Sequence, residues 1–227
     1  MHPEVYVVIP VYNEAPVIRR VVTEVLAVFS NVVCVNDGST DNSAAEISTT
    51  AAVLINHPIN LGQGAALQTG LEYALSDPKA ECFVTFDSDG QHRVEDAVTM
   101  LEILKKGDYD VVLGSRFLGK AENMPLLKRL VLKAAVAFSN ATSGIRLTDA
   151  HNGLRAFNRA FAEDLEITIP QMAHATEITH CIAEKHYRYL EVPVTIRYTD
   201  YSLSKGQSAL NAVNISFDLL MNRITRR

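Results

Sequence analysis

The segment Cys82-Phe83-Val84-Thr85-Phe86-Asp87-Ser88-Asp89-Gly90 leads from an apolar run of strand type straight into a pair of acidic residues. In an extended chain, residues i and i+2 point the same way, so Asp87 and Asp89 can both face one hard cation and, through it, a diphosphate. Triplets of this kind are also frequent in surface turns. The position of the segment in the predicted sheet therefore decides what the two acids do.

Short apolar runs rich in β-branched residues alternate with longer segments of helical period along the chain. The predicted strands cover residues 5–9, 32–35, 53–55, 82–86, 111–113, 154–157 and 192–198, and the predicted helices cover about 16–29, 65–75, 126–139 and 175–185. This alternation is typical of βαβ units. We therefore predict an α/β fold in a single domain, with a mostly parallel central sheet flanked by helices.

Polar side chains follow several of these strands at the point where each strand ends. Asp37 follows the second predicted strand, Asp87 and Asp89 follow the fourth, and Arg116 follows the fifth. Ligands of open α/β sheets bind outside the carboxyl ends of the strands. A second acid at the same edge therefore favours a ligand site over a solvated turn for the segment that contains Asp87.

The composition argues against several classes of protein. The 227 residues include 21 Lys and Arg against 26 Asp and Glu, which gives a formal net charge of −5, and 48% of them are apolar. This mild acidity argues against a protein that coats nucleic acid, because such a protein needs a basic face. The sequence has no run of 18 apolar residues, no signal peptide and only three widely spaced cysteines. We therefore expect a cytoplasmic protein with reduced core cysteines.

Five motifs occur in a fixed order along the chain. They are Ile9-Pro10-Val11-Tyr12-Asn13-Glu14, Asn36-Asp37-Gly38-Ser39-Thr40-Asp41, Asn60-Leu61-Gly62-Gln63-Gly64-Ala65-Ala66, Phe86-Asp87-Ser88-Asp89-Gly90-Gln91-His92 and Gly114-Ser115-Arg116. With these motifs the chain resembles the family 2 inverting glycosyltransferases, and most of all their polyprenyl (dolichyl) phosphate mannosyl- and glucosyltransferases. The likeness continues in Asp149-Ala150-His151-Asn152-Gly153-Leu154-Arg155 and in Glu191-Val192-Pro193-Val194.

The resemblance implies a GT-A type, Rossmann-like fold for the catalytic domain, residues 1–207. Within it, we expect residues 1–115 to form the nucleotide half and residues 116–207 to form the acceptor half. Residues 208–227 carry a heptad-like apolar stripe that ends in arginines, which predicts a C-terminal amphipathic helix. A dimer helix, a core helix and a basic membrane anchor all fit this stripe, so a homodimer is one expectation.

The resemblance also implies where the nucleoside of a nucleotide sugar binds. Pro10, Tyr12 and Glu14 are expected around the base and ribose, with Asp37 in hydrogen-bond contact with one of them. A carboxylate suits N–H and O–H donors of this kind. Many relatives have two acids where this chain has Asn36 and Asp37, so the base that is bound stays open.

The charge on the departing nucleoside diphosphate requires positive groups near the phosphates. The resemblance assigns Asp87 and Asp89 to Mg²⁺ or Mn²⁺ and the donor diphosphate, with Gln91 as a further metal ligand. Asp89, Arg116 and Lys205 are the predicted catalytic residues. Arg116 would supply positive charge from the fifth strand, the alternative being a surface ion pair, and Lys205 lies where the family has a basic loop that closes on the phosphates.

The acceptor decides whether the reaction needs a general base. A sugar hydroxyl must lose a proton during its attack, whereas a polyprenyl phosphate is already an anion. Asp149, Asp164 and Glu177 are candidate bases, but none of them stands in an acid–acid motif. This absence favours a phosphate acceptor.

The segment 126–138 has an apolar face, with cations elsewhere on the predicted helix. Its apolar positions are Leu126, Leu127, Leu130, Val131, Ala134 and Phe138, and its basic ones are Lys128, Arg129 and Lys133. A core-facing helix with a solvated basic side fits this pattern, and so does a helix that lies in a membrane interface and brings cations to lipid phosphates. The resemblance favours lipid contact.

These observations predict a metal-dependent inverting glycosyltransferase at the cytoplasmic face of a membrane. It would move a hexose from GDP-mannose or UDP-glucose to a polyprenyl phosphate. One alternative is a glycosyltransferase that acts on a saccharide hydroxyl in the synthesis of a cell-surface glycan. The other is a non-catalytic protein that binds a nucleotide sugar.

Overall fold

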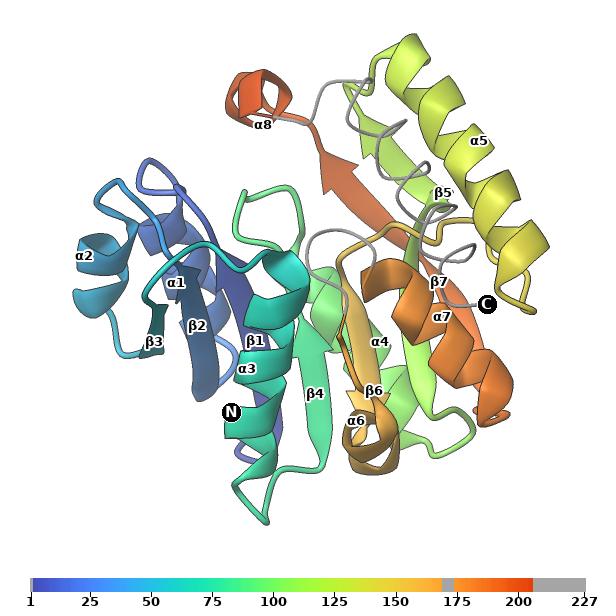
Figure 1. Ribbon diagram of the computed structural model, residues 1–227, viewed down its shortest axis with the longest axis horizontal. Helices are drawn as coiled ribbons and strands as arrows, with labels where there is room; N and C mark the ends of the chain where they lie inside the picture. Colours follow the sequence, from blue (N-terminus) through green and yellow to red (C-terminus); the bar gives the residue numbers. More distant parts are fainter. Residues whose placement is uncertain (1, 169–173, 206–227) are drawn as a thin grey trace.

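The computed structural model describes residues 2–168 and 174–205, and its strands form one sheet (Figure 1). The elements follow one another as β1 (Val5–Val11), α1 (Ile18–Leu26), β2 (Asn31–Asp37), α2 (Ser43–Ser48), β3 (Val53–His57), α3 (Gln63–Leu75), β4 (Cys82–Thr85), α4 (Val94–Lys105), β5 (Val111–Glu122), α5 (Leu126–Thr142), β6 (Arg155–Asn158), α6 (Arg159–Asp164), α7 (His174–Glu184), β7 (Tyr189–Arg197) and α8 (Asp200–Lys205). The expected helix at 208–227 lies outside the described residues.

The sheet is mostly parallel, as the alternation of strands and helices predicts. Its seven strands lie in the order β3-β2-β1-β4-β6-β5-β7, and only β6 runs antiparallel to its neighbours, β4 and β5. β1, β2 and β4 are almost entirely buried, which fits strands that helices cover on both faces. The carboxyl ends of the parallel strands therefore meet at one edge.

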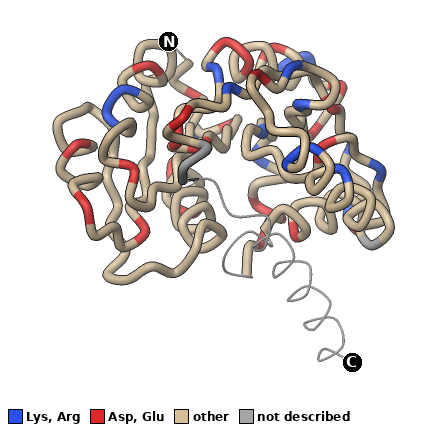
Figure 2. The backbone as a smooth tube through the Cα atoms, turned by 90° about the horizontal axis from the view of Figure 1, so that it is seen from above, with Lys and Arg blue, Asp and Glu red and all other residues tan. Residues whose placement is uncertain are grey.

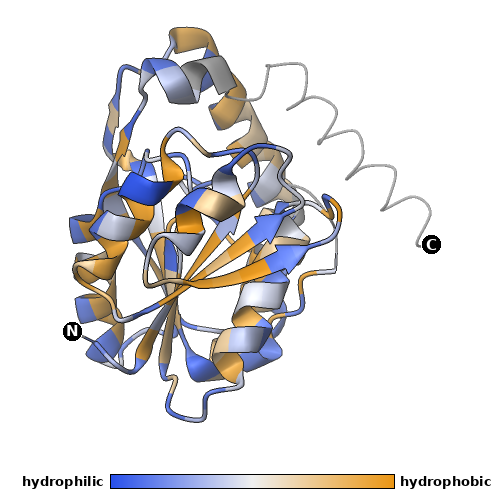
Figure 3. Ribbon diagram, turned by 90° about the vertical axis from the view of Figure 1, so that its left-hand side faces the viewer, coloured by the Kyte–Doolittle hydropathy of each residue, from blue (hydrophilic) through white to orange (hydrophobic). Residues whose placement is uncertain are grey.

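The two larger apolar cores lie on opposite faces of this sheet. One packs the strands against α1 and α4, and the other packs them against α3, α6 and α7. Apolar residues concentrate on the strands and on the helix faces turned toward them (Figure 3). The sheet is thus a rigid platform for the loops at its carboxyl edge.

The predicted end of β5 at residue 113 is wrong. The strand continues to Glu122 and pairs in parallel with β7 on both sides of an irregularity between Ser115 and Lys120. Gly119 lets the two strands approach closely at this irregularity, because a Cβ on this residue would lie 2.2 Å from the carbonyl oxygen of Val194. The extension carries the chain beyond the sheet edge to α5.

The helices α2, α4, α6 and α8 are not among the predicted segments. α5 covers the predicted segment and runs slightly further, to Thr142. In the parts of the chain that the structure describes, no helix combines the length and the apolar character needed to cross a bilayer.

Candidate active site

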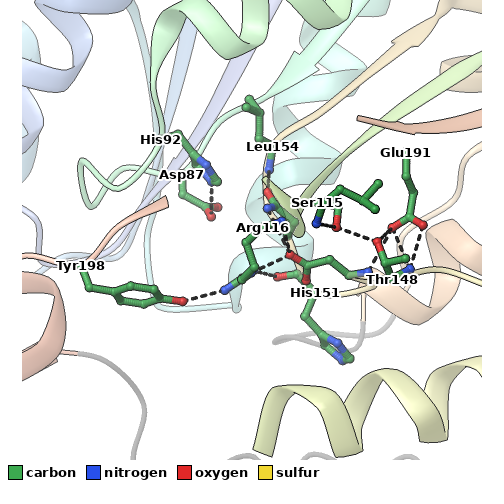
Figure 4. A network of polar contacts seen from close by, with 12 residues as sticks. Asp87, His92, Ser115, Arg116, Thr148, His151, Leu154, Glu191 and Tyr198 are labelled. Carbon is green, nitrogen blue, oxygen red and sulfur yellow. Dashed lines mark hydrogen bonds and ion pairs between the residues drawn. The ribbon is translucent and has the colours of Figure 1, made fainter. Parts of the chain in front are cut away.

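The carboxylate of Asp87 is held by three segments of the chain. Gln63, the first residue of α3, donates to its Oδ1 at 3.1 Å, and His92 Nε2 lies 2.9 Å from its Oδ2. In the loop before β6, a Cβ on Gly153 would lie 2.0 Å from the same Oδ2, so only glycine fits there. Asp87 therefore lies close to the start of α3 and to the loop before β6, and Figure 4 shows its contact with His92.

Asp89 lies in a different electrostatic environment, although it is only two residues away. Its Oδ1 accepts the backbone N–H of Gln91 at 3.0 Å, and its Oδ2 accepts no hydrogen bond from the described residues. Burial and the negative charge of Asp87 raise the pKa of Asp89 to about 6. Burial also acts to raise the pKa of Asp87, but the hydrogen bond and charge of His92 outweigh it and lower that pKa to about 2.

Of the two aspartates, Asp89 fits a cation that the donor helps to hold. Within residues 2–168 and 174–205, no group of three His, Cys, Asp or Glu side chains forms a ready-made metal shell. Both carboxylate oxygens of Asp87 already have protein partners. Asp89 accepts no hydrogen bond at its Oδ2 from the described residues, and its negative charge is repelled by that of Asp87. Mg²⁺ is usually bound by one or two carboxylates together with substrate phosphates and water. The role expected for Gln91 as a ligand stays a prediction.

Asp37 is almost fully buried, with 3% of its side chain exposed. Its Oδ1 lies 2.8 Å from His57 Nδ1 and accepts the N–H of Leu61 at 2.9 Å, and its Oδ2 accepts the N–H of Gly62 at 2.8 Å. Gly62 has φ 97, in the region that glycine adopts readily, and caps α3. Asp37 thus fixes the loop before α3, and its predicted contact with the nucleoside stays a prediction.

The other residues expected around the nucleoside gather after β1. Pro10 and Glu14 are buried and Tyr12 is exposed. Glu14 accepts a hydrogen bond from Tyr201 of α8 at 2.7 Å, which brings the last described helix to this end of the sheet. Lys205 ends that helix, and its side chain lies outside what the structure describes, so its role stays a prediction.

Arg116 is fixed in a buried network instead of a surface ion pair. Its Nε donates to Asp149 Oδ2 at 2.6 Å, its Nη1 donates to the Tyr198 hydroxyl at 2.9 Å, and its Nη2 donates to the His151 carbonyl at 3.1 Å. The side chains of Arg116 and Asp149 are 9% and 0% exposed. Burial opposes the charge on Arg116, but the negative Asp149 outweighs it and raises the pKa of Arg116.

Each of the three candidate bases already accepts hydrogen bonds from other parts of the protein. Asp149 is paired with Arg116. Asp164 accepts from the Tyr187 hydroxyl at 2.8 Å and ends α6, which follows β6 away from the site because β6 runs antiparallel. Glu177 accepts the N–H of Thr168 at 3.0 Å.

A cavity of about 260 Å³ opens beside Arg116, and its lining combines two cations with apolar side chains. The residues that line it are Arg116, Phe117, Gly119, Ala121, Met124, Leu126 and Arg129. These residues come from the extension of β5 and from the start of α5. The long β5 therefore creates a site that the shorter predicted strand would lack.

The apolar face of α5 points away from the core, so the alternative of a core-facing helix is wrong, and the predicted lipid contact stays a prediction. Leu126 is 79% exposed, and Leu127 and Leu130 are each 66% exposed. Two of its cations instead lie over aromatic rings: the Nζ of Lys128 is 4.5 Å from the centre of the Tyr198 ring, and that of Lys133 is 5.9 Å from the centre of the Phe117 ring.

Sequence reasoning missed the residues that support the predicted ones. His92 holds Asp87, although the sequence pattern indicates no role for it. Arg155 of β6 is buried, which lowers its pKa to about 10 against the opposing charges of Asp87 and Asp149. Its Nη1 has no hydrogen-bond partner in the described part of the chain. A polar residue at the start of a predicted buried strand is the one signal that points to it.

Comparisons with known proteins identify the family of this chain. The model of glycosyl transferase family 2 matches residues 6–166. An uncharacterized protein of Methanocaldococcus jannaschii, MJ1222, is 32% identical over 97% of this chain and 93% of its own length. UDP-N-acetylglucosamine–dolichyl-phosphate N-acetylglucosaminyltransferase of Methanococcus voltae is 30% identical over 96% of this chain and 95% of its own length.

The fold also matches solved structures. Glucosyl-3-phosphoglycerate synthase of Mycobacterium tuberculosis, in complex with Mn²⁺, UDP and phosphoglyceric acid, superposes with a TM-score of 0.67 at 16% identity, over 93% of this chain and 76% of that one. This likeness concerns the fold, and it confirms the expected GT-A type. Since the family model covers well over half of the sequence, the chain belongs to glycosyl transferase family 2 and is a glycosyltransferase.

Proposed function

We propose that this glycosyltransferase transfers a hexose, with inversion, from a nucleotide sugar to the phosphate of a polyprenyl phosphate. The cavity beside Arg116 is the observation that carries the proposal. It combines Arg116 and Arg129 with apolar side chains, and it continues onto the exposed leucines of α5. The proposal therefore assigns Arg116 to the acceptor phosphate, whereas the sequence predicted that it serves the departing diphosphate. Arginine suits a phosphate, and the apolar surface suits a hydrocarbon chain. An acceptor with both properties is a lipid phosphate.

The reaction that this acceptor allows needs no general base. An oxygen of the acceptor phosphate attacks the anomeric carbon, the bond from that carbon to the donor diphosphate breaks, and the nucleoside diphosphate leaves with the electron pair. No proton has to be removed from the attacking oxygen, in keeping with the engagement of Asp149, Asp164 and Glu177 elsewhere.

The donor side of the proposal depends on Asp87 and Asp89. When bound, Mg²⁺ or Mn²⁺ supplies positive charge at the departing diphosphate. Asp89 would hold the ion, because its open oxygen and its raised pKa mark the place where a cation relieves repulsion. Asp87 would orient the donor from its fixed position, and we expect Lys205 and Gln91 to complete the phosphate and metal contacts.

The names of relatives support this class of donor and acceptor. The Methanococcus voltae relative is named for UDP-N-acetylglucosamine and dolichyl phosphate, and a Pyrococcus furiosus relative, 30% identical over 90% of this chain and 60% of its own length, is a dolichol-phosphate mannosyltransferase. The donor panel for this chain is therefore GDP-mannose, UDP-glucose and UDP-N-acetylglucosamine.

The exposed face of α5 supports a peripheral position at the cytoplasmic face of a membrane. Leu126, Leu127 and Leu130 would enter the interface between headgroups and acyl chains, where exposed leucines are stabilised. Lys128 and Lys133 lie on the side toward the protein, close to the cavity lining. The helix would thus bring the acceptor phosphate to Arg116 while the lipid chain stays in the membrane.

A transfer assay with matched acceptors tests the proposed function. The purified chain is incubated with Mn²⁺ and each labelled donor, together with a polyprenyl phosphate, the corresponding polyprenol or an oligosaccharide. We expect label in the lipid fraction with the polyprenyl phosphate alone. Label on the oligosaccharide would favour the hydroxyl-directed glycosyltransferase, and donor binding without any product would favour a non-catalytic binding protein.

A further inference from the structure

We propose that Glu191 is the positioning residue of the acceptor site and acts on Arg116 through the loop that contains Thr148 and Asp149. The proposal rests on the proposed function for the identity of the acceptor. Glu191 does not reach the cavity lining itself. Glu191 instead holds the backbone of Asp149, and the carboxylate of Asp149 in turn binds Arg116.

The carboxylate of Glu191 accepts hydrogen bonds from the loop at Thr148 and Asp149. Its Oε1 accepts from Thr148 N at 2.9 Å, from Thr148 Oγ1 at 2.9 Å and from Asp149 N at 3.0 Å, and its Oε2 accepts from Thr148 N at 2.7 Å (Figure 4). Residues 143–154 contain neither helix nor strand. Because no ladder fixes them, a charge-assisted anchor of this kind determines where the loop lies.

Asp149 passes this constraint to the arginine. Its Oδ2 accepts both the backbone N–H of Arg116 at 2.9 Å and the side-chain Nε at 2.6 Å. The backbone N–H of Asp149 is in turn one of the groups bound to Glu191. The position of the guanidinium therefore depends on a chain of hydrogen bonds that begins on β7.

A second link runs from the same loop to the strand that carries Arg116. Thr148 Oγ1 lies 2.6 Å from Ser115 Oγ, and Ser115 immediately precedes Arg116. Glu191 is paired with Leu113 in the β5–β7 register, just before the two strands lose their regular pairing. The anchor is thus located where the extension of β5 would otherwise be free to shift.

The chemistry of Glu191 excludes a direct contact with the acceptor. Both of its oxygens already accept hydrogen bonds from the loop, and its negative charge would repel a phosphate. Its influence should also be confined to one substrate, because Arg116 lines the acceptor cavity whereas Asp89 and Asp37 lie after other strands. Loss of Glu191 should weaken acceptor use and leave donor use intact.

Steady-state kinetics with Glu191→Ala and Glu191→Gln test this inference. We expect Glu191→Ala to raise the KM for polyprenyl phosphate by about 10- to 100-fold, which is the range expected for the loss of a charged hydrogen-bond anchor. The KM for the donor and the dissociation constant for Mn²⁺ should each stay within about twofold of the wild-type values. Glu191→Gln keeps one acceptor oxygen and should recover part of the loss. Glu163→Gln, which alters the exposed pair with Arg159 on α6, is the matched control and should change neither KM. Equal changes in donor and acceptor KM, or a lower melting temperature with both KM values unchanged, would overturn the proposal.

A chemical probe separates this inference from the proposed function. Phenylglyoxal modifies accessible arginines, and mass spectrometry of the digested protein gives the rate at each one. In Glu191→Ala we expect Arg116 to be modified about tenfold faster than in the wild type, while Arg188, an exposed arginine that pairs with Asp110, is unchanged. This result stands even if the wild type uses no polyprenyl phosphate, which would remove the proposed function alone. An unchanged rate at Arg116 would show that Glu191 does not position it.

Discussion

The two halves of the chain carry opposite charge. Residues 1–115 contain 16 Asp and Glu against six Lys and Arg, whereas residues 116–227 contain 10 against 15. Basic residues accordingly gather on the α5 side of the molecule (Figure 2). The half with the paired aspartates suits a cation and the diphosphate bound through it, and the half with the arginine-lined cavity suits an anion. The weak net charge of the whole chain hides this division.

Asp89 in the first half and Arg116 in the second half also differ in how far their charges are compensated by neighbouring groups. Asp89 is left with an open oxygen and a raised pKa, so its charge is poorly compensated without a cation. Arg116 is paired with Asp149 and bound at three nitrogens of its side chain. On the proposed donor side, the negative charge of Asp89 is therefore compensated only when a cation binds. On the proposed acceptor side, the positive charge of Arg116 is held in position before any ligand binds.

Asp89→Asn should have the largest effect, because it removes the poorly compensated charge of the donor side. A bound cation is worth several kcal/mol to the departing diphosphate, so we expect turnover with Mn²⁺ to fall by about 10³-fold. Near wild-type turnover would refute the metal assignment.

The same variant should be more stable than the wild type at pH 7. The folded-state pKa of Asp89 is raised, so its charge destabilises the folded chain above that pKa of about 6, and Asn removes this charge. Thermal unfolding without metal should show a higher melting temperature. A lower one would contradict the repulsion between Asp87 and Asp89.

Arg116→Lys tests the fixed charge of the acceptor side. Lysine keeps the positive charge but cannot reach Asp149, Tyr198 and the His151 carbonyl together. We expect the acceptor KM to rise by about 10- to 100-fold, with an unchanged donor KM. Arg159→Lys is the control, because Arg159 also binds backbone carbonyls, those of Leu75, Asp77 and Ala80, but away from the site. A rise in donor KM in Arg116→Lys would assign the arginine to the donor side.

The double variant Leu127→Ser/Leu130→Ser tests the membrane contact of the acceptor half. Neither leucine lines the cavity, and each is 66% exposed. Partial insertion of two leucines corresponds to about tenfold in partitioning, so binding to lipid vesicles in a sedimentation assay should fall by about that factor. Tyr73→Ser changes an exposed ring on α3 and should leave vesicle binding unaltered. Equal losses in both variants would remove α5 as the contact.

The pH dependence of Mn²⁺ binding should show the smallest effect. Since the pKa of Asp89 is about 6, about half of the molecules carry a proton on it at pH 6 and few do at pH 7. Metal binding requires the deprotonated carboxylate, so affinity should be about twofold weaker at pH 6 than at pH 7. Titration of the protein followed by Mn²⁺ electron paramagnetic resonance measures this. An affinity that does not change with pH would place the ion away from Asp89.

The acidic edge of the sheet could be predicted from the sequence because its residues follow from local rules. Asp37 and Asp87 stand where short buried strands end, and parallel strands bring those ends together. The sequence does not reveal that Asp37 and Asp87 are already held by His57 and His92. Those contacts depend on side-chain packing within the fold.

The acceptor side could be predicted only in part, because it depends on contacts between distant residues. Arg116 and Asp149 are 33 positions apart, and Glu191 is 42 positions from Asp149. The extension of β5 required Gly119 to pass over Val194, which no local pattern indicates. The apolar stripe of α5 fits a core and a membrane equally well, and only the fold shows that it points outward.

The mass of the lipid product and the identity of the released nucleotide test the central claim most directly. The purified chain is incubated with Mn²⁺, a nucleotide sugar and a polyprenyl phosphate, and both products are analysed by mass spectrometry. Attack by the acceptor phosphate on the anomeric carbon predicts a hexosyl monophosphoryl lipid and a nucleoside diphosphate in equal amounts. A diphosphoryl lipid with a nucleoside monophosphate, or an unmodified lipid phosphate beside a glycosylated saccharide, would contradict it.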